Sequence, residues 1–332
     1  MKNIMKRFGN LMCKIADVDN LLAAYYKAAR GKRLSNEVSD FELNLEDNIY
    51  MLREQLLSGT VVVGDYKYFY IHDPKLRLIC AASFRERVLH HAIMNVCHEY
   101  FERNLIYTTY ATRPQKGVYQ AIDRASAALK KHRYFAKFDF RKYFDSISHS
   151  ILKEKLQRLF KDRQLLELLS TIINSYSKSE GKGIPIGNLT SQYFANFFLS
   201  SMDHYIKEIL RIPNYVRYMD DFLVFADTVE EMNLFVDNIR HYAEENLKLT
   251  LKPVVTGLSS DGVSFLGYRL FPNKKLLTQR SKKRYCHKSK LYALFLEKDL
   301  WCEKEYYEHI TPLLSYTLKG YTKGLRKKCL TA

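Results

Sequence analysis

Two apolar segments of the chain carry acidic residues that a buried strand does not ordinarily tolerate. Asp139 lies near the end of the segment FAKFDF, and Asp220 and Asp221 interrupt the segment VRYMDDFLVF. A carboxylate in a buried strand costs free energy unless a cation or a metal ion balances its charge. A surface turn is the alternative for Asp220 and Asp221, because Asp favours turns. Such a turn is not usually flanked by so many aromatic and aliphatic residues.

Three carboxylates from two converging strands would form a site for two hard divalent cations. Mg²⁺ takes oxygen ligands and keeps substrate phosphates in its coordination shell. Two such ions, about 3.5–4 Å apart, activate an attacking 3′-hydroxyl and stabilise a leaving pyrophosphate. This chemistry requires no nucleophilic Ser or Cys, and the sequence has no convincing Ser-His-Asp set, HExxH helix or Walker A loop. We therefore expect Asp139, Asp220 and Asp221 to bind two Mg²⁺ ions, with Mn²⁺ as the alternative ion.

The charge of the chain favours a polyanionic partner. The 332 residues include 53 Lys and Arg against 36 Asp and Glu, which gives a net charge of +17. Such a field attracts polyanions, and the 25 Tyr residues offer flat faces on which bases stack. A soluble basic protein with Tyr in its core is the alternative. The segment from Pro272 onward has 15 Lys or Arg and 5 acids, a net charge of +10, which favours phosphate contact over a solvated helix face.

Several protein classes are not expected. No stretch of 18 apolar residues occurs, so we predict no membrane-spanning helix. The basic N-terminus lacks the continuous apolar run and cleavage site of a signal peptide. The six cysteines are scattered and form no C-x-x-C pair, so we expect neither a zinc site nor a disulfide framework, but reduced thiols in the cytoplasm.

Hydrophobic periodicity predicts an alternation of helices and strands. Residues 1–60 are expected to be helical, with Phe41, Ile49 and Leu56 among the residues of one apolar face and Gly59 as the helix end. The predicted strands are 61–71, 76–82, 134–140, two within 215–225, and 263–271, and the predicted helices are 85–101, 118–131, 149–160, 163–176, 190–210 and 229–245.

The order of the motifs resembles that of reverse transcriptases. Tyr218-Met219-Asp220-Asp221 resembles the family signature, and Asp139 with Phe144 five residues later resembles the first catalytic motif. Further similar segments are LRLICAASFRERV (76–88), KGIPIGNLTSQYFAN (182–196), LTLK (249–252) and FLGY (265–268). The resemblance covers about residues 60–271. It implies an α+β right-hand polymerase with an N-terminal helical extension (1–60), fingers and a palm with an antiparallel sheet (61–271), and a small basic helical thumb (272–332).

The resemblance also implies roles for individual residues. Catalysis is assigned to Asp139, Asp220, Asp221 and Lys252, with Lys252 as proton donor to pyrophosphate, and the backbone carbonyl of Phe140 joins the three aspartates as a metal ligand. The residues implied to bind the dNTP are Arg77, Arg85, Phe144, Ile186, Gly187 and Gln192. The implied primer grip is Phe265, Leu266, Gly267 and Tyr268, and the implied contacts to the nucleic-acid backbone are Lys282, Lys283, Arg284, Lys288 and Lys290.

Simpler roles remain open for several of these residues. Phe144 is expected to exclude a 2′-hydroxyl, but it could equally be a core residue. Arg77 and Arg85 suit a triphosphate because guanidinium binds phosphate bidentately, whereas structural ion pairing, for example with Glu86, is the alternative. Lys252 could be an exposed lysine at a strand end.

One motif departs from the pattern of most bacterial reverse transcriptases. They read Q-G-x-x-x-S-P where this chain has Ile186, Gly187, Ser191 and Gln192. This replacement resembles the enzymes of diversity-generating retroelements, which occur in bacteria and phages. The resemblance implies that the chain copies a template-repeat RNA into cDNA with errors at adenines, holds an RNA–DNA hybrid, and works with a small, basic, oligomeric accessory variability protein.

Two other functions are kept as alternatives. A retron or phage-defence reverse transcriptase is one, since Val255-Thr256-Gly257 is similar to a retron element, although a second expected element is missing. A non-enzymatic RNA-binding scaffold that retains the fold is the other. The set of three aspartates argues against the scaffold, which has no need to hold carboxylates together.

Overall fold

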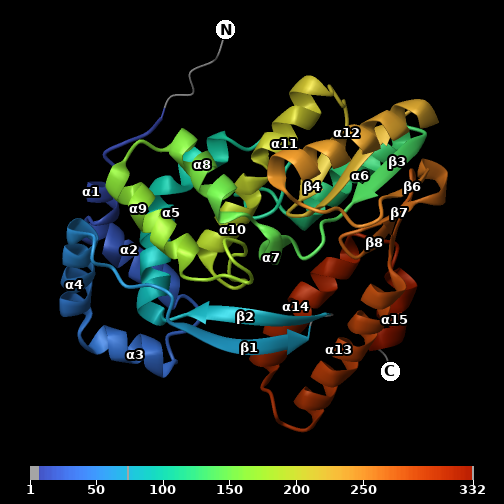
Figure 1. Cartoon of the computed structure of the whole chain (residues 1–332). Helices are drawn as coiled ribbons and strands as arrows, with labels where there is room; N and C mark the ends of the chain where they lie inside the picture. Colours follow the sequence, from blue (N-terminus) through green and yellow to red (C-terminus); the bar gives the residue numbers. More distant parts are fainter. Residues whose placement is uncertain (1–6, 73–74, 331–332) are drawn as a thin grey trace. The chain divides into compact units, whose positions relative to one another are not determined.

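The computed structural model describes residues 7–72 and 75–330, without the side chain of Leu330 (Figure 1). The chain divides into two compact units. Unit 1 comprises Met1–Tyr107, Phe140–Tyr205 and His241–Thr250, and unit 2 comprises Thr108–Asp139, Ile206–Arg240 and Leu251–Ala332. Each unit therefore combines segments that are distant in the sequence. The first six residues of the predicted helical extension, and two residues between the first two predicted strands, lie outside the described residues.

Unit 1 is mainly helical and carries one strand pair. Its elements are α1 (Met12–Ile15), α2 (Val18–Ala29), α3 (Asn36–Leu43), α4 (Leu45–Ser58), β1 (Tyr66–His72), β2 (Leu76–Ala82), α5 (Phe84–Arg103), α7 (Tyr143–Ser146), α8 (His149–Leu159), α9 (Arg163–Asn174), α10 (Leu189–Phe198) and α11 (Ser200–His204). The helix starts follow capping chemistry, since Asp17 accepts from two backbone amides of α2 and Asp162 accepts from Leu165 N of α9. Gly59 ends α4 with φ of 72°, which confirms the predicted helix end.

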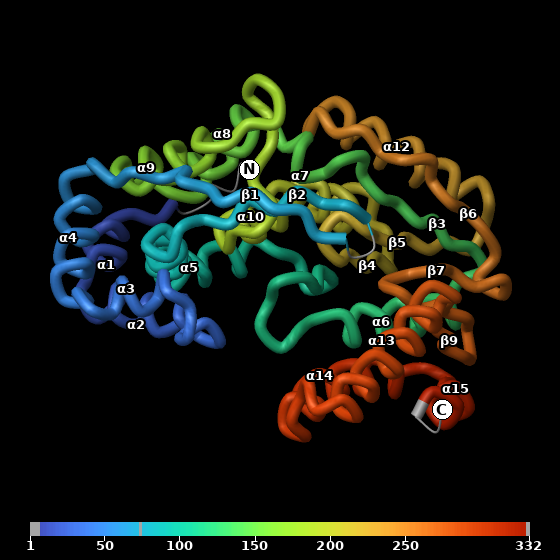
Figure 2. Tube along the Cα trace, turned by 90° about the horizontal axis from the view of Figure 1, so that it is seen from below, coloured from blue at the N-terminus to red at the C-terminus, as the bar shows by residue number. Residues whose placement is uncertain are grey.

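Strands β1 and β2 form an antiparallel hairpin (Figures 1 and 2). The base of this hairpin is buried. At the base, Tyr66, Cys80 and Ala82 form an apolar cluster with Tyr176 beside it. Tyr66 Oη lies 2.7 Å from Ser175 Oγ. Toward the tip of the hairpin, the aromatic side chains are exposed to solvent.

Unit 2 is built around a four-stranded antiparallel sheet in the order β4-β5-β3-β6. Its elements are α6 (Val118–Lys131), β3 (Tyr134–Phe138), a π-helix (Tyr205–Ile209) at its edge, β4 (Tyr215–Tyr218), β5 (Asp221–Ala226), β6 (Val255–Leu258), a 3₁₀ turn (Ser259–Asp261), β7 (Val263–Phe265), β8 (Tyr268–Leu270), β9 (Lys275–Leu277), α13 (Gln279–Glu297), α14 (Glu303–Leu318) and α15 (Lys323–Leu330). Helix α12 (Val229–Leu247) has residues in both units.

Helix α6 supplies the main apolar cover of the unit 2 sheet. Ala121, Ile122 and Ala125 of α6 share one core cluster with Val216 of β4 and Leu223 of β5. The small residues at α6 positions spaced by three and four let the helix approach the sheet closely. This packing holds β4 and β5 in place. It therefore also positions Asp220 and Asp221, which lie where these two strands meet. The predicted α+β class with an antiparallel sheet packed on helices is confirmed.

Two predicted elements are wrong in detail. The segment 263–271 is not one strand but the hairpin β7–β8, because Leu266 and Gly267 take positive φ values of 48° and 85° and reverse the chain. The predicted helix 190–210 is broken into α10, α11 and a π-helical turn. The first error has structural importance, since the turn Leu266–Gly267 lies at the centre of the motif FLGY.

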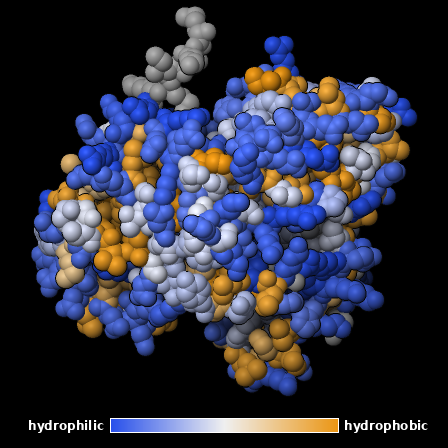
Figure 3. Space-filling model, in the orientation of Figure 1, coloured by the Kyte–Doolittle hydropathy of each residue, from blue (hydrophilic) through white to orange (hydrophobic). Residues whose placement is uncertain are grey.

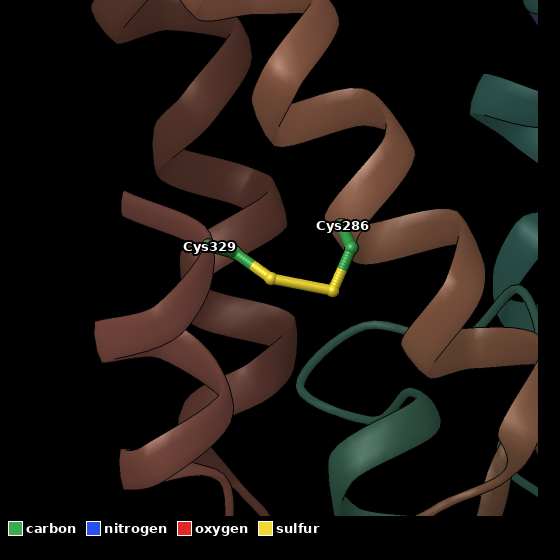
Figure 4. The surroundings of a disulfide bond; sticks show 2 residues. All are labelled: Cys286 and Cys329. Atoms are coloured by element: carbon green, nitrogen blue, oxygen red, sulfur yellow. A yellow bond between two sulfur atoms is a disulfide. The ribbon is translucent and has the colours of Figure 1, made fainter. Parts of the chain in front are cut away.

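Helices α13 and α15 are joined by a disulfide bond (Figure 4). Cys286 and Cys329 are separated by 43 residues, and their Cα atoms lie 5.5 Å apart, a spacing within the usual range for a disulfide. The expectation that all six cysteines are reduced is therefore wrong for this pair. The remaining four cysteines are free.

The hydropathy of the surface can be compared with the polar composition of the sequence. The face of the molecule drawn in Figure 3 is mainly hydrophilic, with hydrophobic residues in small separate patches. Among the residues that the structure describes, no helix is both long and apolar enough to cross a membrane.

Candidate active site

The acidic pair Asp220–Asp221 lies at the tight turn between β4 and β5. Tyr218 and Asp221 are the last paired residues of this hairpin. Met219 takes a positive φ of 55°, a conformation that costs free energy for any residue except Gly. Its carbonyl accepts a hydrogen bond of 2.9 Å from Arg217 Nη1. The turn therefore keeps its strained shape with the help of a cation within its own hairpin.

Arg217 is completely buried, although it carries a charge. The backbone of Arg217 pairs with residues 108–110 beside β4: Arg217 N donates to Thr108 O at 3.0 Å, and Tyr110 N donates to Arg217 O at 2.9 Å. A buried guanidinium is retained only where it is well hydrogen-bonded. Sequence reasoning missed Arg217, and its position inside an apolar strand, like that of Asp139, was the signal that could have found it.

Asp139 is brought to the same edge of the sheet by the register of β3. Phe138 pairs with Phe222 of β5, and their rings stack with centroids 4.6 Å apart. The next register position places Asp139 opposite Asp221. The three predicted aspartates therefore converge at the end of neighbouring strands in unit 2.

The electrostatics of Asp221 reflect this convergence. Burial raises the pKa of Asp221 to about 6, nearby Lys137 opposes the shift, and the charges of Asp139 and Asp220 add to it. Its side chain is 24% exposed, and Oδ2 lies 3.2 Å from Lys137 Nζ. Oδ1 is buried and has no hydrogen-bond partner within the described part of the chain. Asp221 Oδ1 is therefore available to bind a cation in addition to Lys137.

Asp139 and Asp221 each form an ion pair with a lysine. Lys252 Nζ forms an ion pair with Asp139 Oδ2, and Lys252 N also donates to Asp139 O at 2.8 Å. Lys137 contacts Asp221 and donates to Ser264 O at 2.9 Å. Lys137 was not predicted. Its spacing of two residues from Asp139 was the available signal, because side chains at that spacing share one face of a strand.

The donor set suits hard divalent cations. Among residues 7–72 and 75–330, no three His, Cys, Asp or Glu side chains are close enough to hold a metal ion by themselves. Carboxylate oxygens are nevertheless the ligands that Mg²⁺ prefers, and substrate phosphates and water complete its shell. Asp221 Oδ1 is buried and has no hydrogen-bond partner among the described residues, so it is available as a ligand for such an ion.

A cavity of about 350 Å³ opens beside these carboxylates within unit 2. Asp139, Lys137, Lys252 and Arg269 contribute its charged groups. The remaining lining residues are Phe135, Pro253, Val255, Gly262, Val263 and Ser264. The cavity is therefore a basic recess with a carboxylate at one side, which suits the phosphate groups of a bound nucleic acid.

The predicted primer grip divides into buried and turn residues. Phe265 and Tyr268 are buried in the core, and Leu266 and Gly267 form the turn of the β7–β8 hairpin. Ser281 Oγ of α13 donates to Gly267 O at 2.8 Å. A Cβ at position 267 would collide with the hydroxyl of Tyr316 on α14. The turn is thus fixed by two helices of the basic C-terminal segment.

The predicted nucleotide-binding residues lie in unit 1. Cys80 N of β2 donates to Ile186 O at 2.8 Å, which docks the loop 182–188 on the hairpin β1–β2. Gly187 has φ of 126°, and a Cβ there would lie 2.9 Å from Ile79 and 3.0 Å from Cys80 O. Glycine is therefore required by this close approach.

The other predicted residues of unit 1 differ in exposure. Phe144 is half-buried, and its carbonyl accepts from Ile184 N at 3.0 Å. Arg77 and Gln192 are exposed. Arg85 is half-buried and donates to Gln55, and burial lowers its pKa. The backbone of Phe140 also belongs to unit 1, whereas the three aspartates and Lys252 belong to unit 2.

The predicted thumb contacts lie on one helix. Lys283, Arg284 and Lys290 of α13 are exposed, and Lys282 and Lys288 are half-buried. Helix α13 therefore presents positive charge to solvent along much of its length.

Comparison with known proteins decides the family. A family model described as reverse transcriptase (RNA-dependent DNA polymerase) matches residues 72–270, which is more than half of the chain. The chain belongs to the reverse transcriptase family. This reverse transcriptase is an RNA-directed DNA polymerase, and the matched range contains the three aspartates and the loop 182–188.

The relatives of this reverse transcriptase are diverse. It is 25% identical over 276 residues to Protein YkfC of Escherichia coli, covering 69% of this chain and 72% of that protein. It is 21% identical over 219 residues to the COX1/OXI3 intron 1 protein of Saccharomyces cerevisiae, covering 62% of this chain but only 26% of that protein. The chain spans 38% of the corresponding intron 2 protein.

Solved structures support the fold. A telomerase from Candida tropicalis, in complex with a fragment of telomeric RNA, matches with a TM-score of 0.51 and 14% sequence identity. The match covers 77% of this chain and 53% of the telomerase. The reverse transcriptase therefore has the right-hand polymerase fold that the sequence predicts.

Proposed function

We propose that this reverse transcriptase copies a template-repeat RNA into adenine-mutagenised cDNA, by two-metal nucleotidyl transfer, for a diversity-generating retroelement. The observation that carries the chemistry is the convergence of Asp139 and Asp221 on neighbouring strands, with Asp221 Oδ1 buried and unpartnered. The observation that supports the subclass is the pair Ile186 and Gln192, where most bacterial relatives have Gln and Pro.

In this mechanism, Asp139, Asp220 and Asp221 bind the metal ions, together with the carbonyl of Phe140. When bound, Mg²⁺ neutralises the triphosphate and polarises the attacking 3′-hydroxyl. Lys252, paired with Asp139, donates a proton to the departing pyrophosphate. Lys137 balances the charge of Asp221 while no metal is present.

Substrate selection follows from the residues of unit 1. Arg77 and Arg85 contact the triphosphate of the dNTP, Phe144 blocks a 2′-hydroxyl, and Gly187 allows the backbone to approach the nucleotide. Ile186 offers only apolar contact to the nucleotide sugar, and Gln192 lines the same site.

The nucleic acid is held by charge. The β7–β8 turn grips the primer, and the cations of α13 follow the backbone of the RNA–DNA hybrid without reading its sequence. We further propose a small, basic, oligomeric accessory variability protein as partner.

The test is sequencing of cDNA made by the purified enzyme from the RNA of its own locus, with Mg²⁺ and dNTPs. We expect full-length products with errors concentrated at template adenines. Copying with uniform, low error rates would retain the polymerase and reject the subclass. No cDNA, with or without the accessory protein, would reject the proposed function.

A further inference from the structure

A second basic cavity lies in unit 2, and the proposed function does not use it. It has a volume of about 440 Å³ and is bounded by three segments that are distant in the sequence. Its lining residues are Asp123, Ser126, Ala127 and Lys130 of α6, Phe271–Lys275 from the end of β8 to the start of β9, and Leu318–Tyr321 from the last residue of α14 onward. The hydrogen bond from Tyr321 N to Lys275 O, 2.8 Å long, joins the last two segments. We call this cavity the lysine pocket.

The charge of the lysine pocket is strongly positive. Four lysines line it, namely Lys130, Lys274, Lys275 and Lys319, and Asp123 is its single acid. Asp123 is shared, because it pairs with Lys275 and lies 3.9 Å from Lys319. Lys130 and Lys274 have no carboxylate partner among the residues that the structure describes. An anion bound in the pocket would offset the repulsion among these lysines.

The walls of the lysine pocket also offer a hydroxyl and two rings. Ser126 is 6% exposed, and its Oγ has no hydrogen-bond partner within the described chain. A buried hydroxyl without a partner is unfavourable, so a ligand oxygen that accepts a hydrogen bond from it is favoured. Lys274 Nζ lies 4.8 Å from the ring centre of Phe271, and the ring of Tyr321 is 73% exposed. Such rings stack on bases.

We propose that the lysine pocket binds one nucleotide of an RNA strand outside the hybrid that is being copied. The phosphate lies between Lys130 and Lys274, Ser126 donates to it, and Tyr321 stacks on the base. The lysine pocket shares no lining residue with the cavity beside Asp139, so the two sites can hold different parts of one RNA. The inference rests on the proposed copying of an RNA template by this chain.

The test compares two RNA probes. The first is a short blunt RNA–DNA hybrid, and the second is the same hybrid with a long single-stranded RNA extension. The variant is Lys130→Ala/Lys274→Ala. The matched control is Lys131→Ala/Lys298→Ala, which removes the same charge from two exposed lysines that do not line the pocket.

We expect the pocket variant to bind the extended probe at least fivefold more weakly and the blunt hybrid as the wild type does. The slope of log affinity against log salt should fall by roughly 0.7 for each phosphate that the variant no longer neutralises. The control should change neither value. Equal affinities of variant and control for the extended probe would overturn the proposal, and so would an equal weakening on both probes.

Two further experiments distinguish a free nucleotide from an RNA strand as the ligand of the lysine pocket. Calorimetry with AMP alone measures binding of a free nucleotide, and tight AMP binding without any effect on the extended probe would overturn the proposal. A photo-crosslinking residue at Tyr321 should attach to nucleotides of the single-stranded extension, and crosslinks confined to the hybrid would contradict it. Primer extension by the wild type on a hybrid whose DNA 3′ end is recessed on the template RNA tests the proposed function separately, since binding requires no catalysis.

Discussion

At the scale of single residues, the carboxylates define what the site can do. The structure brings Asp139, Asp220 and Asp221 to one end of a sheet, whereas the residues proposed to contact phosphate are Lys and Arg. We expect Asp139→Asn or Asp220→Asn to lower primer extension at least roughly 10³-fold, because metal binding supplies several kcal/mol of barrier lowering. RNA binding by filter retention should stay within about twofold, a range of less than 1 kcal/mol. Extension by either variant near the wild-type rate would reject the metal-ligand assignment.

The raised pKa of Asp221 predicts a pH-dependent cost to stability. Its pKa rises from 3.8 in the unfolded chain to about 6 in the folded protein, so folding favours the protonated form. Protonated Asp221 therefore adds to the free energy of unfolding below about pH 4, and this contribution is lost as the pH rises through 6. The shift corresponds to at most about 3 kcal/mol, since one unit is 1.36 kcal/mol.

Asp221→Asn removes this cost. In metal-free buffer, we expect the variant to melt at a higher temperature than the wild type at pH 7.5 and at a similar temperature near pH 4. Thermal unfolding with a chelator present measures both. A variant less stable than the wild type at pH 7.5 would show that the interaction with Lys137 outweighs burial.

Arg217 donates a hydrogen bond to the turn that carries Asp220 and Asp221, the proposed metal ligands. Its hydrogen bond to Met219 O involves a charged donor, and such bonds contribute about 1.5–3 kcal/mol. If part of this supports the active geometry, Arg217→Lys should lower kcat by roughly 10-fold at an unchanged KM for dNTP, since 1.36 kcal/mol is tenfold. Single-nucleotide extension kinetics measure both constants. Arg240→Lys is the exposed control, and a folded Arg217→Lys enzyme with normal kcat would remove the positioning role.

At the scale of elements, the disulfide between α13 and α15 makes a prediction of its own. It closes a loop of 43 residues, for which about 2–4 kcal/mol of stabilisation is expected. Reductant should therefore lower the melting temperature of the wild type but not that of Cys329→Ser. Cys13→Ser, which changes an exposed free thiol, should respond to reductant as the wild type does. Free Cys286 in the oxidised wild-type protein, detected by mass spectrometry, would contradict the bond.

The elements also show which parts of the fold the sequence predicts. Strands β1 and β2 and helices α5 and α6 follow from local composition and period, and they lie close to the predicted ranges. The hairpin β7–β8 does not follow, because its turn is held by helices outside the motif: Tyr316 of α14 donates to Leu266 O, and Ser281 of α13 donates to Gly267 O. The pairing of Cys286 with Cys329 likewise depends on helix packing that no local pattern encodes.

The residues of the candidate site also divide into those that the local sequence predicts and those that it does not. Asp139 and Asp221 were predictable, because a carboxylate in an apolar strand is conspicuous. The partners of these residues were less so, since the contact of Lys137 with Asp221 depends on which strands are neighbours in the sheet. Buried cations such as Arg217 can be recognised in the sequence by the criterion applied to the aspartates, namely a charge inside an apolar strand.

At the scale of the whole molecule, charge and fidelity are the properties that matter. The chain has a net charge of +17, and basic side chains gather on α13, in the lysine pocket and in the cavity beside Asp139. Electrostatic binding of this kind holds an RNA whatever its sequence. Accuracy must therefore come from the pose of the nucleotide, and the residues proposed to set that pose are Ile186, Gly187 and Phe144.

Ile186 is the residue at which fidelity can be tested. In the usual motif a Gln amide at this position can hydrogen-bond the sugar, whereas isoleucine makes only apolar contact. One hydrogen bond contributes about 0.5–1.5 kcal/mol, which corresponds to roughly 2- to 10-fold in discrimination. Ile186→Gln should lower misincorporation by that factor, with the largest fall at template adenines. Deep sequencing of cDNA made on one template by the wild type and by Ile186→Gln measures this, with Ile184→Val as the apolar control. Identical error spectra would show that the sugar contact at Ile186 does not set the accuracy of this polymerase.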